Sequence, residues 1–221
     1  MNGKWHRRFA VILVAIICIA MVVSGGSMFF SGSGLPSTNS NTSTNAPNSV
    51  ADYQAQKVRI AAIAEQAKAD PGNIPLQNDL GNEYYDAGVA AQSVAPTEAQ
   101  GNFRQAVEAY QNVLKTNKDP NVMVDMATAA FKSGNNDLAE KSFQEALTLK
   151  PDFYNGLVNY GVFLANAKQD LAGAITQWQK AQKFAPDSSA KAQLATMISQ
   201  AQSQLQAPIN KGTSNPATPG K

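Results

Sequence analysis

The stretches "EKSFQEALTLKPD" (140–152) and "ITQWQKAQKFAPD" (175–187) carry the same arrangement 35 residues apart. Each places an aromatic residue (Phe143, Trp178), then an alanine three positions on, then a proline that cannot continue a helix. A repeat of this length is typical of helical hairpins that stack in tandem. One hairpin cannot bury its apolar face alone, so neighbouring copies share a core.

Each of these helices is preceded by a segment with apolar or small residues at i, i+3, i+4 and i+7, which predicts one helical face. The three copies are Gln77/Leu80/Gly81/Tyr84, Met123/Met126/Ala127/Ala130 and Leu157/Tyr160/Gly161/Leu164. The second helices carry Ala106/Tyr110/Val113, Ala139/Phe143/Ala146 and Ala174/Trp178/Ala181. We expect the small residues to let the two helices of a hairpin approach, and the aromatic residues to fill the gap to the next hairpin.

Glycines and prolines predict where these helices end. Gly88 and Gly134 are expected to follow first helices, since glycine tolerates a positive φ. Pro71, Pro151 and Pro186 are expected to stop second helices.

With these features, "DPGNIPLQNDLGNEYYDAG" (70–88) and "AEKSFQEALTLKPD" (139–152) resemble the tetratricopeptide repeat (TPR) family. The resemblance implies an all-α, right-handed α-solenoid with repeats at 74–119, 120–153 and 154–187. Gln77 departs from the family pattern, where a large residue is usual. The first repeat also carries a 13-residue insert between its helices, 89–101. The third has an extra residue near "NAKQD" (166–170) and no turn glycine.

Two further helices are predicted to flank the repeats. Residues 50–73 read as a leading helix, or degenerate half repeat, that opens with Ser49 and Asp52 at capping-box spacing. Residues 188–206 read as a C-terminal capping helix with a polar outer face. Their apolar positions are Tyr53, Ile60, Ile63 and Ala67 in the first, and Leu194, Met197, Ile198, Ala201 and Leu205 in the second.

The N-terminus reads as a membrane anchor. A basic tip (1–8) precedes an uncharged, mostly apolar run at 9–30, and about 20 such residues cross a bilayer. We expect a single transmembrane helix with its N-terminus in the cytoplasm of a bacterial cell and the rest extracytoplasmic. The alternatives are a cleaved signal peptide, which would leave a secreted protein, or a lipoprotein through Cys18, against which Ile17 argues. Residues 31–49 and 207–221 are predicted to be a disordered linker and tail.

Charge and residue types exclude several functions. The net charge is +2, but after residue 51 there are 15 basic and 16 acidic side chains, so no nucleic acid partner is expected. The one histidine (His6) and the one cysteine (Cys18) lie in the N-terminal segment. We therefore predict that the chain is not an enzyme, with no catalytic residues, no cofactor and no metal site.

The TPR resemblance implies that the first helices line a groove that binds a peptide or protein partner. The positions that would contact it are Asn78, Asn82, Tyr85 and Asp86; Val124, Thr128, Phe131 and Lys132; and Val158, Val162, Ala165 and Asn166. Asn78 and Asn82 are equally well ordinary surface residues. Packing against the first-repeat insert or the leading helix is the favoured alternative for Tyr85 and Phe131, and an intramolecular segment could cover the valines. We expect a groove with little charge.

The function indicated is a membrane-tethered TPR scaffold that binds a protein or peptide on the extracytoplasmic side. The order of anchor, linker, repeats and capping helix is similar to that of the TPR domains of bacterial cytochrome-c maturation factors. It is also similar to that of anchored TPR proteins of envelope assembly. The alternative is a homo-oligomerising structural module of the cell envelope.

Overall fold

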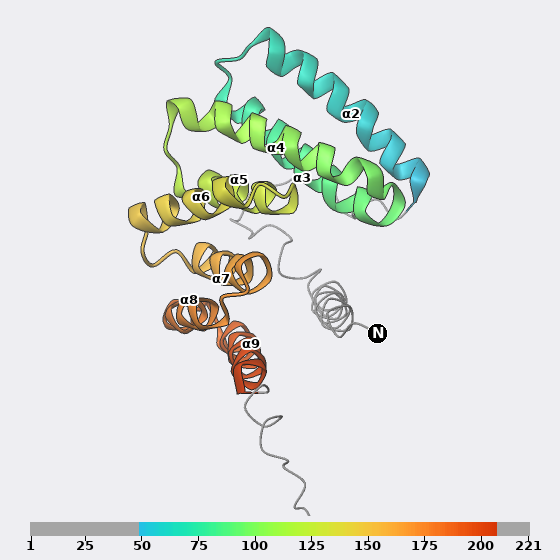
Figure 1. The fold of residues 1–221 in the computed structure, drawn as a ribbon. Coiled ribbons are helices and arrows are strands. Elements are labelled where there is room, and N and C mark those ends of the chain that lie inside the picture. The colour runs from blue at the N-terminus through green and yellow to red at the C-terminus, as the bar shows by residue number, and fades with distance from the viewer. Residues whose placement is uncertain (1–48, 207–221) are drawn as a thin grey trace, which may run out of the picture. The chain divides into compact units, whose positions relative to one another are not determined.

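The computed structural model describes residues 49–206, and every regular element in that range is a helix (Figure 1). The α-helices are α2 (Val50–Ala69), α3 (Ile74–Val94), α4 (Pro96–Thr116), α5 (Pro120–Lys132), α6 (Asn136–Leu149), α7 (Tyr154–Phe163), α8 (Leu171–Lys183) and α9 (Ser188–Gln206). A short π-helix, Leu164–Lys168, follows α7. The all-α repeat fold predicted from the sequence is confirmed for this part of the chain.

The predicted anchor at 9–30 and the tail at 207–221 lie outside the described residues, as does the linker apart from Ser49. Within 49–206, no helix combines the length and the hydrophobicity that crossing a membrane requires.

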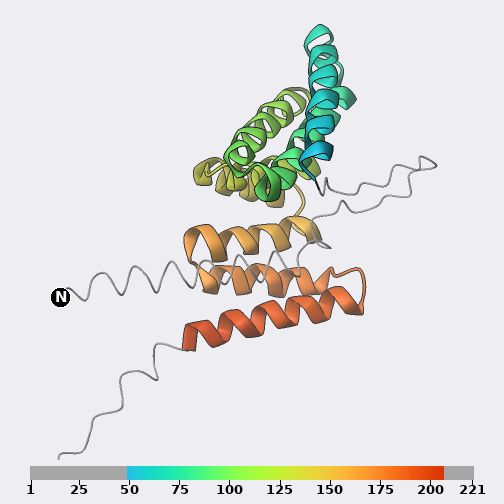
Figure 2. The same cartoon turned by 90° about the vertical axis from the view of Figure 1, so that its right-hand side faces the viewer.

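Consecutive helices pack in pairs: α3 with α4, α5 with α6, and α7 with α8. The leading helix α2 packs on α3, and α9 packs on α8. Figure 2 shows α7, α8 and α9 as successive layers. Leu194, Ile198 and Ala201 of α9 are buried, whereas Leu205 is 45% exposed. The α9 helix therefore covers the end of the stack with most of its predicted apolar face.

Local signals set most helix ends. The Ser49 hydroxyl accepts a hydrogen bond from the Asp52 backbone N–H (3.1 Å), as the capping-box spacing predicts. Asn73 and Asn135 cap α3 and α6 in the same way. Gly134 turns the chain after α5 with a φ of +87°, as expected of glycine at this position.

The first pair differs from the prediction, because residues 89–101 are not a loop between two helices. They extend α3 to Val94 and form the start of α4 from Pro96, so both helices have 21 residues. Gly88 consequently lies inside α3 and does not end it. A Cβ atom at Gly88 would lie 2.6 Å from the Phe103 ring of α4, so glycine is required here for close helix approach.

Two of the three aromatic residues lie beside glycines of their own hairpin, a contact that the expectation that they fill the gap to the next hairpin did not include. A Cβ atom at Gly81 of α3 would lie 2.5 Å from the Tyr110 ring of α4. Gly161 of α7 faces Trp178 of α8 in the same way. Phe143 is the residue that follows the prediction, since its ring packs against Tyr160 of the next pair at 5.6 Å.

The third pair accommodates its extra residue in the π-helix Leu164–Lys168. A π-helix absorbs one additional residue within a helical segment. Gln169 then takes a left-handed conformation (φ 56°). Gly134 has a positive φ at the corresponding turn of the second pair. The missing turn glycine is thus replaced by a strained glutamine.

Candidate partner-binding surface

The residues predicted to contact a partner come from α3, α5 and α7, and we call the surface they outline the first-helix face. On α3, Asn82 is exposed, and its Oδ1 accepts a hydrogen bond from the Tyr110 hydroxyl (2.8 Å). Asn78 is half-buried, and its Oδ1 is buried without a hydrogen-bond partner. The hydrogen bond from Tyr110 therefore fixes the Asn82 side chain, while the Asn78 side-chain oxygen remains without a donor.

Tyr85 lies one turn further along α3. Its ring packs edge-on against Phe103 of α4, with 5.5 Å between the ring centroids. Its hydroxyl oxygen is buried and, like Asn78 Oδ1, has no hydrogen-bond partner. Burial raises the pKa of Tyr85 strongly, and the negative charges of Asp125 and Asp86 raise it further. The hydroxyl is thus a buried group that stays neutral at physiological pH.

On α5 the exposed residues differ from the predicted contact residues. Val124 and Thr128 are 2% and 6% exposed, and the Thr128 hydroxyl donates to the Val124 carbonyl within the helix. Val124 packs on α7, where a Cβ atom at Gly156 would lie 3.2 Å from its Cγ2. Val124 and Thr128 therefore offer no surface to a partner. The exposed residues on this helix include Asp125 instead.

Further along the stack, Phe131, Val158 and Val162 are half-buried. The Phe131 ring packs edge-on against Phe163 of α7 at 5.5 Å. The Val158 carbonyl accepts a hydrogen bond from the Trp178 indole N–H (3.2 Å). Each of these residues thus combines a packing role with a partly accessible side chain.

Two carboxylates lie on helices that carry the first-helix face, Asp86 on α3 and Asp125 on α5. Asp86 was among the residues that the TPR resemblance indicates, and Asp125 was not. Both residues keep an exposed part, and partial burial of the carboxyl group raises the pKa of each to about 6. The signal that could have found Asp125 is helical spacing, because Asp125 and Asn121 form an i, i+4 pair of polar residues on a mostly apolar helix.

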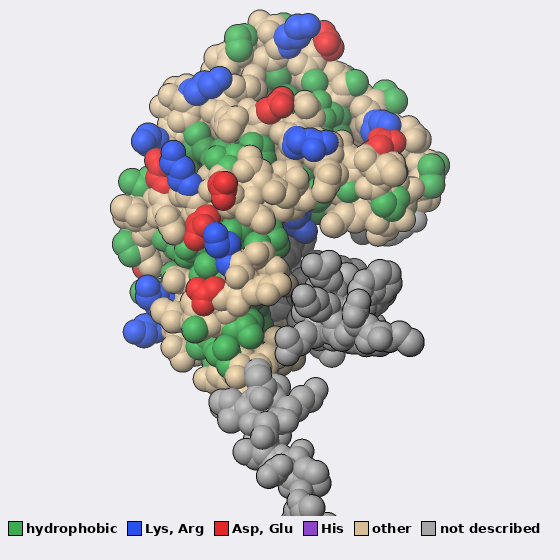
Figure 3. All heavy atoms as spheres, viewed as in Figure 1, with side chains coloured by type: hydrophobic (Ala, Val, Ile, Leu, Met, Phe, Trp, Pro, Cys, Tyr) green, Lys and Arg blue, Asp and Glu red, His purple; other side chains and the backbone are tan. Residues whose placement is uncertain are grey.

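Three charged side chains influence the pKa of these carboxyl groups. Glu83 raises the pKa of Asp86 and Arg59 lowers it, and these two neighbours form an ion pair at 3.0 Å. Asp119 raises the pKa of Asp125. Figure 3 shows basic and acidic side chains interspersed on the side that it draws. Within residues 49–206, no group of three or more His, Cys, Asp or Glu side chains is placed to hold a metal ion.

A separate cavity of about 270 Å³ lies between α4 and the turn from α5 to α6. Its lining is Arg104, Val107, Glu108, Gln111, Ser133, Asn135 and Leu138, none of them a residue of the first-helix face. Its lining mixes charged, amide and aliphatic side chains, and no buried polar atom in it lacks a hydrogen-bond partner.

Tandem helix pairs, with a large side chain of one helix set against a glycine of the other, define a helical repeat domain of the TPR type. A family model described as "Cilia and flagella-associated protein 70 middle TPR-like domain" matches residues 92–210, more than half of the 221-residue chain. The chain therefore belongs to this family of TPR-like domains.

Solved structures agree on the fold. The crystal structure of MamA is 15% identical, and the match covers 72% of this chain and 94% of MamA with a TM-score of 0.51. A second crystal structure of the MamA protein is also 15% identical, covering 76% of this chain and 92% of MamA with a TM-score of 0.50. At such identity the likeness concerns the fold alone. No curated protein sequence matches the chain.

Proposed function

We propose that this protein is a non-enzymatic scaffold that binds an extended peptide or protein segment on its first-helix face. The observation that supports it is the pair of buried polar atoms without partners on α3, Asn78 Oδ1 and Tyr85 Oη. An unsatisfied buried polar group costs about 1–3 kcal/mol, so a change of side-chain rotamer on binding that gives either atom a hydrogen bond to the ligand is favourable. Asn82 lies between them and is exposed.

The proposed contact residues are the accessible part of the predicted set: Asn78, Asn82, Tyr85, Phe131, Val158 and Val162. The half-buried valines and Phe131 would pack against apolar side chains of the segment. The asparagines would hydrogen-bond to its backbone, since an amide side chain both donates and accepts. Recognition by an extended segment needs this mixture of apolar surface and amide groups.

We further propose that residues 9–30 tether the scaffold to a bacterial cell membrane, with the repeats on the extracytoplasmic side. The uncharged length of that segment and the basic residues before it support this placement. A tether raises the local concentration of partners in the same membrane, so modest affinity suffices. The proposed setting is assembly or maturation of envelope proteins such as c-type cytochromes, on the likeness of domain order described above.

The test places a photo-crosslinking residue at Asn82 in the full-length protein, expressed in its native cell. The matched control carries the same residue at Gln105, an exposed amide on α4 of the same helix pair. We expect a distinct protein crosslinked at Asn82 and absent at Gln105, identified by mass spectrometry.

Crosslinks to the same proteins from both positions would contradict binding on this face. Crosslinks from Asn82 only to another copy of the chain would instead favour the alternative, a homo-oligomerising module of the envelope.

A further inference from the structure

The cavity between α4 and the turn from α5 to α6 is lined by one guanidinium and one carboxylate group, those of Arg104 and Glu108. Both residues are exposed and lie one turn apart on α4, at the i, i+4 spacing of helical ion pairs. They nevertheless form no ion pair with each other, and neither belongs to the four ion pairs formed among residues 49–206. Two opposite charges therefore line one cavity without neutralising each other.

The uncharged polar side chains of the lining add both donors and acceptors. Asn135 Oδ1 accepts a hydrogen bond from the Leu138 backbone N–H (3.2 Å), which leaves the amide NH₂ group of Asn135 as a donor. The Ser133 hydroxyl donates to the Ala130 carbonyl (2.8 Å), which leaves its oxygen as an acceptor. The exposed Gln111 amide can both donate and accept. The lining can therefore hydrogen-bond to an anionic group and to a cationic group.

The rest of the lining is aliphatic, and the cavity is small. Val107 is buried and Leu138 is half-buried, so both offer apolar surface to a ligand. The volume of about 270 Å³ is below the roughly 300–1,000 Å³ of sites that hold drug-sized ligands. A complementary ligand is thus a small molecule with one anionic group, one cationic group and a short aliphatic part.

We propose that this cavity binds a free α-amino acid with a small aliphatic side chain. The Arg104 guanidinium binds the carboxylate, since its N–H groups match the two carboxylate oxygens. The Glu108 carboxylate and the Ser133 oxygen accept hydrogen bonds from the ammonium group. The aliphatic side chain of the ligand packs against Val107 and Leu138.

This site goes beyond the proposed function and does not depend on it, because none of the lining residues belongs to the first-helix face. The lining joins two helix pairs, since α4 is part of the first pair and the turn from α5 to α6 is part of the second. A bound amino acid therefore contacts both pairs at once.

The test is isothermal titration calorimetry of the full-length chain in nonionic detergent micelles, with titrations into protein-free micelles as background. Three compounds share the same carbon skeleton but differ in charge. L-valine carries both charged groups, isobutylamine lacks the carboxylate, and 3-methylbutanoate lacks the ammonium group. We expect L-valine to bind at least about 10-fold more tightly than either of the other two, since each charge-assisted hydrogen bond contributes about that factor.

Variants assign each charge of the ligand to its partner. Arg104→Gln should weaken L-valine binding about 10-fold and leave isobutylamine unchanged, because isobutylamine has no carboxylate. Glu108→Gln should weaken L-valine binding by a similar factor and leave 3-methylbutanoate unchanged. Lys141→Gln and Glu65→Gln make the same changes of charge at exposed positions outside the cavity and should have no effect.

Equal affinity for the three compounds, or no binding of L-valine at about 10 mM, would overturn the amino-acid site. So would an equal loss in the control variants, or an equal effect of Arg104→Gln on L-valine and isobutylamine. None of these outcomes bears on the first-helix face, which the crosslink at Asn82 tests separately.

Discussion

Gly81 controls how closely α3 and α4 approach. Alanine at this position favours the helix by about 1 kcal/mol, but its Cβ would lie 2.5 Å from the Tyr110 ring. Overpacking of this kind costs about 1–3 kcal/mol, and Tyr110 is held by its hydrogen bond to Asn82. The net effect of Gly81→Ala should be a lower free energy of unfolding in urea titrations, by up to about 2 kcal/mol.

The matched control is Gly101→Ala. Gly101 lies inside α4, and a Cβ atom there would have nothing within 4 Å. This variant should therefore gain about 0.5–1 kcal/mol from helix propensity alone. A loss of stability in both variants would show that packing against Tyr110 is not the cause.

Asp86 and Asp125 should cost stability at neutral pH, because partial burial disfavours their charged forms. Their folded pKa of about 6 lies above the ordinary carboxyl value, so the folded state holds these protons more tightly than the unfolded chain. Stability from these groups therefore rises as the pH falls from 6 towards 4. Because both side chains are exposed, solvent screening keeps the effect modest.

We consequently expect Asp86→Asn and Asp125→Asn to raise the urea midpoint at pH 7.5 and to leave it unchanged at pH 4. Glu65→Gln serves as control at both pH values. A lower midpoint at pH 7.5 would mean that the carboxylates make stabilising contacts when charged.

At the scale of elements, the end of α7 shows how the fold accommodates an extra residue and the absence of a turn glycine. Gln169 has a φ of 56°, a conformation that costs a residue with a side chain about 1 kcal/mol. Gln169→Gly should stabilise the protein by about that amount, measured by thermal and urea unfolding. Gln179→Gly, in the exposed interior of α8, should instead cost about 1 kcal/mol. Equal effects of the two changes would contradict this account.

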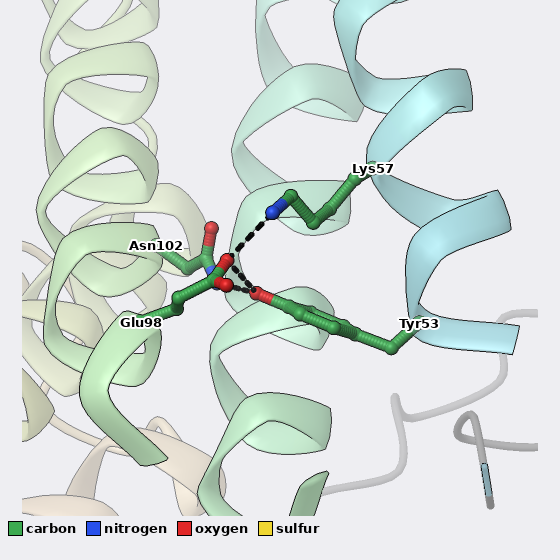
Figure 4. A network of polar contacts seen from close by, with 4 residues as sticks. All are labelled: Tyr53, Lys57, Glu98 and Asn102. Carbon is green, nitrogen blue, oxygen red and sulfur yellow. Dashed lines mark hydrogen bonds and ion pairs between the residues drawn. The ribbon is translucent and has the colours of Figure 1, made fainter. Parts of the chain in front are cut away.

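The leading helix α2 is fixed to the start of α4 by one polar network (Figure 4). The Tyr53 hydroxyl donates to Glu98 (3.0 Å) and accepts from Asn102 (2.7 Å), and Lys57 pairs with Glu98 at 2.8 Å. Hydrogen bonds from Lys57 and Tyr53 lower the pKa of Glu98. A lowered pKa means that this contribution is present at neutral pH and is lost as the pH falls below the ordinary range of glutamate.

Tyr53→Phe removes the central hydroxyl and leaves the buried ring in place. We expect a loss of about 1–2 kcal/mol and faster amide hydrogen exchange in α2, with α5 and α6 unchanged. Tyr84→Phe removes a hydroxyl outside this network and serves as the control. Unchanged exchange in α2 would show that apolar packing of Tyr53, Ile60 and Ala67 is sufficient to hold the helix.

At the scale of the whole molecule, the sequence predicted the stack because prolines and small residues recur at fixed intervals. It did not predict the continuity of α3 and α4 through 89–101. Gly88 and Gly101 resemble loop residues, yet glycine is compatible with a helix where another helix approaches closely or where solvent lies beside it.

The sequence also did not predict which side of α5 is exposed, for a different reason. Helix α7 packs over Val124 through Gly156, which turns Asp125 to the surface. Contact between sequence-distant helices decides which side is covered, and periodicity within one helix does not reveal it. The partner contacts expected on α3 needed no such shift, because α3 packs mainly against its immediate neighbours α2 and α4.

The stack should also lose structure from its ends, since each pair contacts mainly its neighbours. The buried core falls into one cluster from α2 to α4 and another from α4 to α9. Leu194 of α9 is 1% exposed, so Leu194→Ala should cost about 2–5 kcal/mol. We expect hydrogen exchange to accelerate in α7, α8 and α9, while α2, α3 and the first half of α4 keep their protection.

Leu205→Ala makes the same change on the same helix at a side chain that is 45% exposed, and should alter stability by at most about 0.5 kcal/mol. If Leu194→Ala instead accelerated exchange equally from α2 to α9, the two clusters would unfold as one cooperative unit. The structure of the first-helix face would then depend on the capping helix α9. With separate clusters, α3 keeps Asn78, Asn82 and Tyr85 in place when the C-terminal end frays, so Leu194→Ala should leave the Asn82 crosslink intact.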